Sequence, residues 1–176
     1  WYADLLDGHG NGVVCIWSFG LPFLPGYAAS EKAGAAVLPR ERPSVTVSVY
    51  RDGREAFYLF TELSPEECEW AQDTWRFGGF EAQLNREGRL KLTMDLPIPG
   101  SADRFEAELM LEGCLRQSRD EARDPAHSWE PVLLGKVEGV FKGRAGAREF
   151  SLAGRGYHDR NAGVSGMHRL GIQHWR

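Results

Sequence analysis

Cysteine is scarce in this chain, and positive charge does not dominate it. The 3 cysteines, Cys15, Cys68 and Cys114, lie far apart and show no Cys-x-x-Cys spacing, so we expect reduced, semi-buried packing residues. The 21 Lys and Arg residues are scattered and outnumbered by 25 Asp and Glu, which gives a formal net charge of -4. This balance lacks the basic stripe that nucleic-acid binding requires, so no nucleic-acid partner is expected.

Long hydrophobic runs are also lacking. The apolar stretch at residues 13–19 is far shorter than the roughly 20 residues that span a bilayer, so no transmembrane segment is expected. No signal peptide is visible, yet the sequence opens at Trp1 rather than at methionine. We therefore expect an excised domain from which a targeting segment has been removed.

Glycine, proline and aromatic residues are abundant instead. The 176 residues include 21 Gly, 9 Pro, 6 Trp, 5 Tyr and 9 Phe, and 42% of the chain is hydrophobic. A chain of this size can form one domain with a real core, and frequent turn residues favour short strands over a helical bundle. We therefore expect a single domain over residues 1–176 that is built from strands and turns.

Alternating apolar and polar residues predict where the strands lie. Residues 12–19 form an apolar, β-branched run, and residues 44–50 place Val45, Val47 and Val49 on one face. Further strands are expected at 56–61, 74–84, 89–96, 104–109, 135–141 and 148–156, with turns at 51–54, 85–88 and 142–146. About eight strands at regular spacing predict an all-β, antiparallel barrel or sandwich, whose mouth could hold one ligand.

Residues 156–163 are the densest cluster of functional side chains in the sequence. They read Gly-Tyr-His-Asp-Arg-Asn-Ala-Gly and combine a phenol, an imidazole, a carboxyl group and an amide. Side chains two apart on a strand share a face, so Tyr157 and Asp159 are expected to point together and His158 to point away. Asp159 is expected just beyond the end of a strand.

A second cluster occupies residues 127–131, which read His-Ser-Trp-Glu-Pro. By the same rule, His127 and Trp129 are expected to share a face. The residues between the two clusters alternate like two strands, so both clusters should meet at one edge of the sheet. Function is expected where they meet.

Together these side chains indicate acid catalysis. An apolar aromatic pocket disfavours the charged form of a carboxyl group, so Asp159 is expected to hold a proton and donate it. The rings of Tyr157 and Trp129 present negative π-faces that stabilise a developing carbocation by roughly 0.5–2 kcal/mol. His127 would position water or accept its proton. The predicted catalytic set is therefore Asp159, His127, Tyr157 and Trp129.

Structural roles for the same side chains remain open. Glycine-flanked Asp and Asn residues often form turns, so Asp159 could close a turn instead. Tyr157 and Trp129 could equally pack in the core or at its rim.

Other kinds of site have weaker support in the sequence. His127, His158, His168 and His174 match no compact ligand spacing, so we expect surface histidines and no metal site. The sequence has no serine-hydrolase elbow, phosphate loop or dinucleotide fingerprint, and no cofactor is expected.

Several short motifs, taken in their order, resemble a known family. They are Trp1-Tyr2 before an acidic-glycine turn and an apolar strand, His127-x-Trp129-x-Pro131, Lys136-Val137-Glu138, Gly156-Tyr157-x-Asp159-x-Asn161-x-Gly163 and Trp175. In this combination the chain resembles, over nearly its whole length, the amino-terminal lobe of the carotenoid 1,2-hydratase (hydroxyneurosporene synthase) and AttH-like group.

The resemblance implies a lipocalin-like (calycin-type) β-barrel that encloses a site for a long apolar isoprenoid. Such proteins usually have two lobes, so residues 1–176 would be the amino-terminal lobe and a second lipocalin-like lobe would be its partner. In the hydratases a carboxylic acid protonates the terminal isopropylidene double bond of a carotenoid, and water captures the tertiary cation without a cofactor. Carried onto this chain, Asp159 would donate the proton, Tyr157 and Trp129 would stabilise the cation, and His127 would assist the water or the carboxyl group.

The implied function is acid-catalysed hydration or cyclisation of a terminal isoprenoid C=C bond, the activity of a hydro-lyase in carotenoid biosynthesis. His158 gives a Gly-Tyr-His-Asp form that is similar to AttH-like relatives, and Ala162 stands where the hydratases often have tryptophan. Related lipocalin-like proteins include tocopherol cyclase and pericyclases. The alternatives are therefore a pericyclase-type scaffold and a lobe that binds lipid or polyene without chemistry. The resemblance further implies a cytoplasmic protein with peripheral membrane association, because its substrates dissolve in lipid.

Overall fold

The protein is built from β-strands. The computed structural model describes residues 1–20, 29–30, 33–35, 38–71, 73–115 and 128–162. Its strands are β1 (Tyr2–Leu6), β2 (Gly12–Phe19), β3 (Pro43–Arg51), β4 (Arg54–Glu62), β5 (Cys68–Ala71), β6 (Thr74–Phe77), β7 (Phe80–Leu84), β8 (Arg89–Pro97), β9 (Arg104–Leu115), β10 (Ser128–Pro131), β11 (Leu133–Ala145) and β12 (Arg148–Ala162). Two short 3₁₀ helices, η1 (Pro39–Glu41) and η2 (Pro65–Glu67), lie between them. Within this part of the chain, no helix has the length and apolar character needed to cross a membrane.

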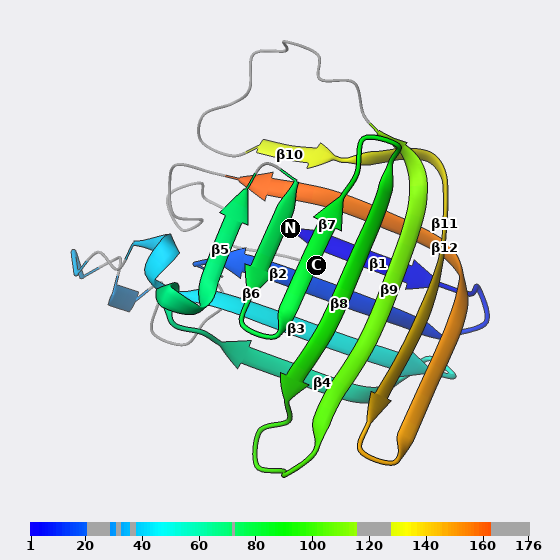
Figure 1. The fold of residues 1–176 in the computed structure, drawn as a ribbon, viewed down its shortest axis with the longest axis horizontal. Coiled ribbons are helices and arrows are strands. Elements are labelled where there is room, and N and C mark those ends of the chain that lie inside the picture. The colour runs from blue at the N-terminus through cyan, green and yellow to red at the C-terminus, as the bar shows by residue number, and fades with distance from the viewer. Residues whose placement is uncertain (21–28, 31–32, 36–37, 72, 116–127, 163–176) are drawn as a thin grey trace.

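The strands form one 12-stranded antiparallel sheet that curls over on itself. Its order is β4-β3-β2-β1-β12-β11-β9-β8-β7-β6-β5, and β10 pairs with β12 beside this path. Figure 1 shows β5 to β8 lying in front of β1 to β4, while β9, β11 and β12 curve from one layer toward the other. The prediction of an all-β antiparallel fold is confirmed, and the sheet has the form of a half-barrel.

Period-two alternation decides which side chains enter the space between the layers. Val45, Val47 and Val49 of β3 are all buried, and so are Leu90 and Leu92 of β8. These groupings confirm the predicted faces, because residues two apart on a strand point to the same side. The buried faces of the two layers therefore turn toward each other.

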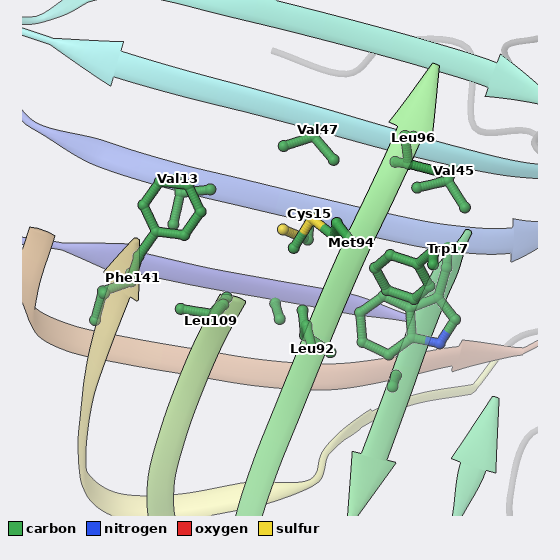
Figure 2. Close-up of a cluster of buried hydrophobic side chains, with 14 of the residues drawn as sticks. Val13, Cys15, Trp17, Val45, Val47, Leu92, Met94, Leu96, Leu109 and Phe141 are labelled. Atoms are coloured by element: carbon green, nitrogen blue, oxygen red, sulfur yellow. The ribbon is translucent and has the colours of Figure 1, made fainter. Parts of the chain in front are cut away.

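Large apolar side chains fill this inner space. Figure 2 shows Cys15 and Trp17 of β2 beside Leu92 and Met94 of β8, which crosses in front of them. The largest fully buried side chains include Trp17, Phe77, Phe80, Phe105 and Phe141. Between the layers the described residues thus form a packed core. Burial of apolar surface in such a core is the largest favourable contribution to the free energy of folding.

Two predicted elements are wrong. Residues 74–84 are not one strand, because Gly78 adopts a positive φ of 58° and turns the chain between β6 and β7. A Cβ atom at Gly79 would lie only 1.9 Å from the carbonyl oxygen of Asp95, so the close approach of β8 requires glycine there.

The turn predicted at residues 142–146 begins too early, since β11 continues to Ala145. Gly143 lies within the strand, where a Cβ atom would press against the ring of Phe141 at 2.9 Å and against Ala107 at 3.1 Å. Glycine at this position serves packing, whereas the sequence pattern read it as a turn.

The cysteines follow the prediction in part. Cys15, Cys68 and Cys114 are all free thiols, as expected. Cys15 and Cys68 are buried, but Cys114 is exposed, so its predicted packing role is wrong.

Candidate functional site

Strand β12 carries the first predicted cluster. The prediction that Asp159 lies just beyond the end of a strand is wrong, because β12 continues to Ala162 and pairs there with β10. The predicted alternation is confirmed: His158 lies opposite the fully buried Ala3 and faces the core, while Tyr157 and Asp159 face the outer side of the sheet. The alternative in which Asp159 closes a turn is therefore wrong.

Asp159 is a nearly buried carboxyl group, with 6% of its surface exposed. Its Oδ2 atom accepts hydrogen bonds from the indole Nε1 of Trp129 at 2.7 Å and from the hydroxyl group of Tyr157 at 3.1 Å. Its Oδ1 atom accepts a hydrogen bond from the Nδ2 atom of Asn161 at 3.1 Å. Both oxygens are thus held in fixed directions.

Trp129 reaches Asp159 from the neighbouring strand β10. The pairing sets Trp129 opposite Asn161 and Pro131 opposite Asp159, which places the indole on the same outer face. An indole N–H can only donate, so the hydrogen bond fixes the ring orientation. The side chain of Trp129 is 57% exposed and forms an accessible aromatic wall beside the carboxyl group. The predicted meeting of the two clusters is confirmed for Trp129, while His127 lies outside the described residues.

Two of the three hydrogen-bond partners of Asp159 can act as donors or as acceptors. A hydroxyl group both donates and accepts, so Tyr157 can donate to a carboxylate or accept from a protonated carboxyl group. An amide can likewise turn its oxygen toward a donor, which gives Asn161 the same freedom. The side chains of Tyr157 and Asn161 can therefore keep their hydrogen bonds to Asp159 either as donors or as acceptors.

Sequence reasoning missed a second Tyr-x-Asp pair beside the first. Tyr2 of β1 lies directly opposite Asp159, and Asp4 lies opposite Tyr157. The hydroxyl group of Tyr2 donates to Oδ2 of Asp4 at 2.8 Å, and the rings of Tyr2 and Tyr157 lie 6.2 Å apart. The repeat of Tyr-x-Asp at residues 2–4 and 157–159 was the signal that could have revealed this group of four side chains, Tyr2, Asp4, Tyr157 and Asp159, which we call the outer square.

Burial and neighbouring charge shift the pKa values of Tyr2, Asp4 and Tyr157 in the outer square. Burial is the main cause that raises the pKa of Asp4, and the negative charge of Asp159 adds to it, while the hydrogen bond from Tyr2 opposes it. Burial also raises the pKa of Tyr157 to about 12, together with the charge of Asp159. Asp4 therefore keeps its proton to a higher pH than an ordinary aspartate, and both phenols remain hydrogen-bond donors near neutral pH.

Further side chains, from buried to exposed, extend the site across the outer face of the sheet. Residues opposite one another on successive strands form a row that runs through Asp159, Tyr2, Ile16, Thr46 and Phe60. A second row beside it runs through Tyr157, Asp4, Val14, Ser48 and Tyr58. Neighbouring strands lie about 4.8 Å apart, so each row is about 19 Å long. The outer face thus offers a long surface of aromatic, aliphatic and polar side chains with Asp159 at one end.

The two hollows that stand out lie away from this square. The larger, about 740 Å³, opens to solvent between β3, β9, β11 and β12, and charged residues such as Arg51, Lys142 and Glu149 line it. The smaller, about 40 Å³, adjoins Tyr50 and Phe150. Neither is lined by Asp159 or Trp129. A ligand in the mouth of the barrel stays a prediction.

Histidines do not gather into a metal site in the part of the chain that is described. No three His, Cys, Asp or Glu side chains among these residues are arranged to hold a metal ion. His158 is fully buried, so the prediction that it is a surface residue is wrong. His127, His168 and His174 lie outside the described residues.

Comparisons with protein-family models, with curated proteins and with solved structures gave no match.

Proposed function

We propose that this chain protonates a terminal C=C bond of an apolar isoprenoid, leading to hydration or cyclisation, with Asp159 as the acid. One observation carries the proposal: a nearly buried carboxyl group is held by hydrogen bonds from the two aromatic side chains beside it, Trp129 and Tyr157. A positioned acid next to electron-rich rings is what protonation of an alkene needs. The half-barrel form of the sheet is compatible with a lipocalin-like lobe, which we propose as the finer fold.

The proposed reaction balances without a cofactor. The proton of Asp159 and the π-electrons of the alkene form a C–H bond at the less substituted carbon, which leaves a tertiary cation. Water adds to the cation and forms the C–O bond, and its excess proton returns to the carboxylate of Asp159. In cyclisation a second double bond takes the place of water, and the proton that the resulting cation loses goes to the carboxylate. The rings of Trp129 and Tyr157 would stabilise the cation through their π-faces.

The row that begins at Asp159 supports a long substrate. Tyr2, Ile16 and Phe60 give it apolar surface over about 14 Å beyond Asp159, which suits an extended polyene better than a compact ligand. The reactive end of such a chain would lie against Asp159 and Trp129, while its remainder crosses β1 to β4. Binding energy from the remote part would then hold the double bond against the acid.

A second function, binding of a polyene or lipid without chemistry, is favoured by a different observation. Both oxygens of Asp159 already accept hydrogen bonds, so the carboxyl group could serve only to fasten β10 to β12. The exposed ring of Trp129 would then be a contact surface for the ligand and not a cation-stabilising group.

Replacement of Asp159 by asparagine separates the two functions. The asparagine oxygen can still accept from Trp129 and Tyr157, and Asn161 can turn its amide to accept from the new NH₂ group, so stability should fall by less than about 1 kcal/mol. An amide cannot deliver the proton, so turnover should fall at least about 100-fold. The assay incubates the protein in D₂O with an acyclic carotenoid that has terminal isopropylidene groups. Mass spectrometry of the wild-type product should find one deuterium on the carbon next to the new alcohol.

Trp129→Phe is the matched control. It keeps an aromatic face but replaces the two-ring indole by one ring and removes the N–H that donates to Asp159, so activity should fall far less than in Asp159→Asn. Full activity of Asp159→Asn would refute acid catalysis by this residue. If the wild-type protein binds the carotenoid and releases it unchanged, the binding function holds instead.

A further inference from the structure

Asp4 is a second carboxyl group in the outer square, and the reaction described above does not use it. The pairing of β1 with β12 sets Asp4 opposite Tyr157 and Tyr2 opposite Asp159. Residues that lie opposite one another on paired strands share a face, so both carboxyl groups stand on the outer face. Asp4 and Asp159 occupy diagonal positions, which lie about 7–8 Å apart on antiparallel strands.

The two carboxyl groups differ in their hydrogen bonds. Both oxygens of Asp159 accept hydrogen bonds, which three side chains donate. Asp4 accepts one hydrogen bond, from the hydroxyl group of Tyr2 to Oδ2 at 2.8 Å. Among the described residues, no donor reaches its Oδ1 atom. The lone pairs of this oxygen are therefore available to a water molecule.

Asp4 also has the solvent access and the proton affinity that a base needs. Its side chain is half-buried on the outer face, so water reaches it, whereas Asp159 is nearly buried. Burial is the main cause that raises the pKa of Asp4, and the negative charge of Asp159 adds to it. The carboxylate of Asp4 therefore takes up a proton more readily than that of an ordinary aspartate.

The diagonal spacing suits an acid and a base that act on the two carbons of one double bond. The proton of the acid joins one carbon, and the water held by the base joins the next. In inverting glycosidases, carboxyl groups about 6.5–9.5 Å apart leave room for a water molecule between the base and the substrate. The side chains of Asp4 and Asp159 stand off one face from positions with a separation of the same order.

We propose that Asp4 is the base that holds the attacking water and takes its proton, an inference that rests on the proposed function with Asp159 as the acid. As the C–O bond forms between the water and the tertiary cation, one O–H bond of the water breaks and its proton passes to Oδ1 of Asp4. Solvent water then removes this proton from Asp4 and returns one to Asp159. Each cycle consumes one alkene and one water, and the proton returns to Asp159 by way of Asp4.

Deuterium incorporation separates the step of Asp4 from that of Asp159. Each protein is incubated in D₂O with an acyclic carotenoid that has terminal isopropylidene groups, and mass spectrometry measures the alcohol and the deuterium in the recovered carotenoid. In Asp4→Asn the cation still forms, but without a base for the water it loses a proton to Asp159 and becomes an alkene again. Alcohol formation should therefore fall at least about 10-fold, while deuterium in the recovered carotenoid rises. In Asp159→Asn both should be lost.

Glu138→Gln is the matched control. Glu138 is an exposed carboxylate of β11 that pairs with Lys136, so this variant should form the alcohol as the wild type does. Asp4→Asn should fold, because the asparagine oxygen still accepts from Tyr2. Should it fail to fold, Asp4→Ala with added sodium formate gives a second test, since formate supplies the missing carboxylate and should restore alcohol formation.

The role of Asp4 is overturned if Asp4→Asn forms the alcohol at the wild-type rate, or if it loses deuterium incorporation together with the alcohol. Asp159→Asn then judges the acid separately. A cyclic wild-type product without an alcohol would also overturn the role of Asp4, because no water is captured. If the wild-type protein yields neither a product nor deuterated carotenoid, the proposed function fails and the role of Asp4 fails with it, a result that the wild type alone distinguishes from the others.

Discussion

The two faces of β12 differ in whether their buried polar side chains have hydrogen-bond partners. On the outer face, both oxygens of Asp159 receive hydrogen bonds, although the adjoining Trp129 is 57% exposed. On the inner face, His158 and Trp17 are fully buried, yet each has a ring nitrogen without a partner. The burial of a side chain therefore does not tell whether its polar atoms have hydrogen-bond partners.

This difference gives the two faces of β12 different electrostatic environments. On the outer face, the carboxyl group of Asp159 has a fixed direction, which supports its proposed role as an acid. On the inner face, an unpaired donor and an unpaired acceptor in an apolar core each lose their hydration without a replacement hydrogen bond among the described residues. Experiments that perturb one face and spare the other test this contrast.

The largest expected difference is in stability. Trp17→Ala removes a fully buried ring that packs against four other rings, so the free energy of unfolding should fall by about 3–5 kcal/mol. Trp129→Ala, the matched change on the outer face, removes a half-exposed ring and one hydrogen bond, so the loss should be about 1–2 kcal/mol. Urea unfolding of both variants measures this. Equal losses would mean that Trp129 is as deeply part of the core as Trp17.

The second-largest expected effect is a loss of stability at acidic pH that is caused by His158 on the inner face. Burial lowers the pKa of His158 from 6.5 to about 4, so between these values the unfolded chain binds the proton and the folded chain does not. The stability that neutral His158 contributes is therefore present above about pH 6.5 and is lost as the pH falls toward 4. At about 1.4 kcal/mol per pH unit, the loss should approach 3 kcal/mol.

His158→Phe should remove this part of the pH dependence, because phenylalanine keeps a ring against Trp17 and cannot be protonated. Urea unfolding between about pH 4 and pH 7 would compare the two proteins. If their stability curves stay parallel over this range, the imidazole is not held neutral by the core.

The strands could be predicted where apolar and polar residues alternate regularly. The prediction failed where glycine can mark either a turn or a tightly packed position within a strand. Val45, Val47 and Val49 followed period two, and their burial confirms it. Gly143 read as part of a turn, but it lies in β11, where the ring of Phe141 leaves no room for a Cβ atom. A sequence window contains no information about which ring will press on a glycine from its own or a neighbouring strand.

The candidate site was predictable within a strand and not between strands. The shared face of Tyr157 and Asp159 follows from their spacing. Their pairing with Tyr2 and Asp4 depends on β1 joining β12, which brings together residues more than 150 positions apart. The unused nitrogens of His158 and Trp17 are a property of three-dimensional packing, so no local pattern could have indicated them.

The smallest expected effect is on the outer face and has the opposite sign to that of His158. Because burial raises the pKa of Asp4, the folded state favours its protonated form. The stability from that form is complete below the usual value of 3.8 and is lost as the pH rises through the folded pKa. Asp4→Asn mimics the protonated form and can still accept from Tyr2, so it should be more stable than the wild type at neutral pH and equal to it in acid. The gain should not exceed about 0.5 kcal/mol, because solvent reaches part of the side chain.

Asp7→Asn is the control for this last change. Hydrogen bonds from the Asn11 side chain and from the backbone of His9 lower the pKa of Asp7, so its replacement should reduce stability at neutral pH and have less effect in acid. Urea unfolding of both variants from about pH 3 to pH 7 would show the two trends diverging with pH. If Asp4→Asn behaved like Asp7→Asn, Asp4 would be an ordinary surface carboxylate, and the outer square would reduce to Asp159 and its three donors.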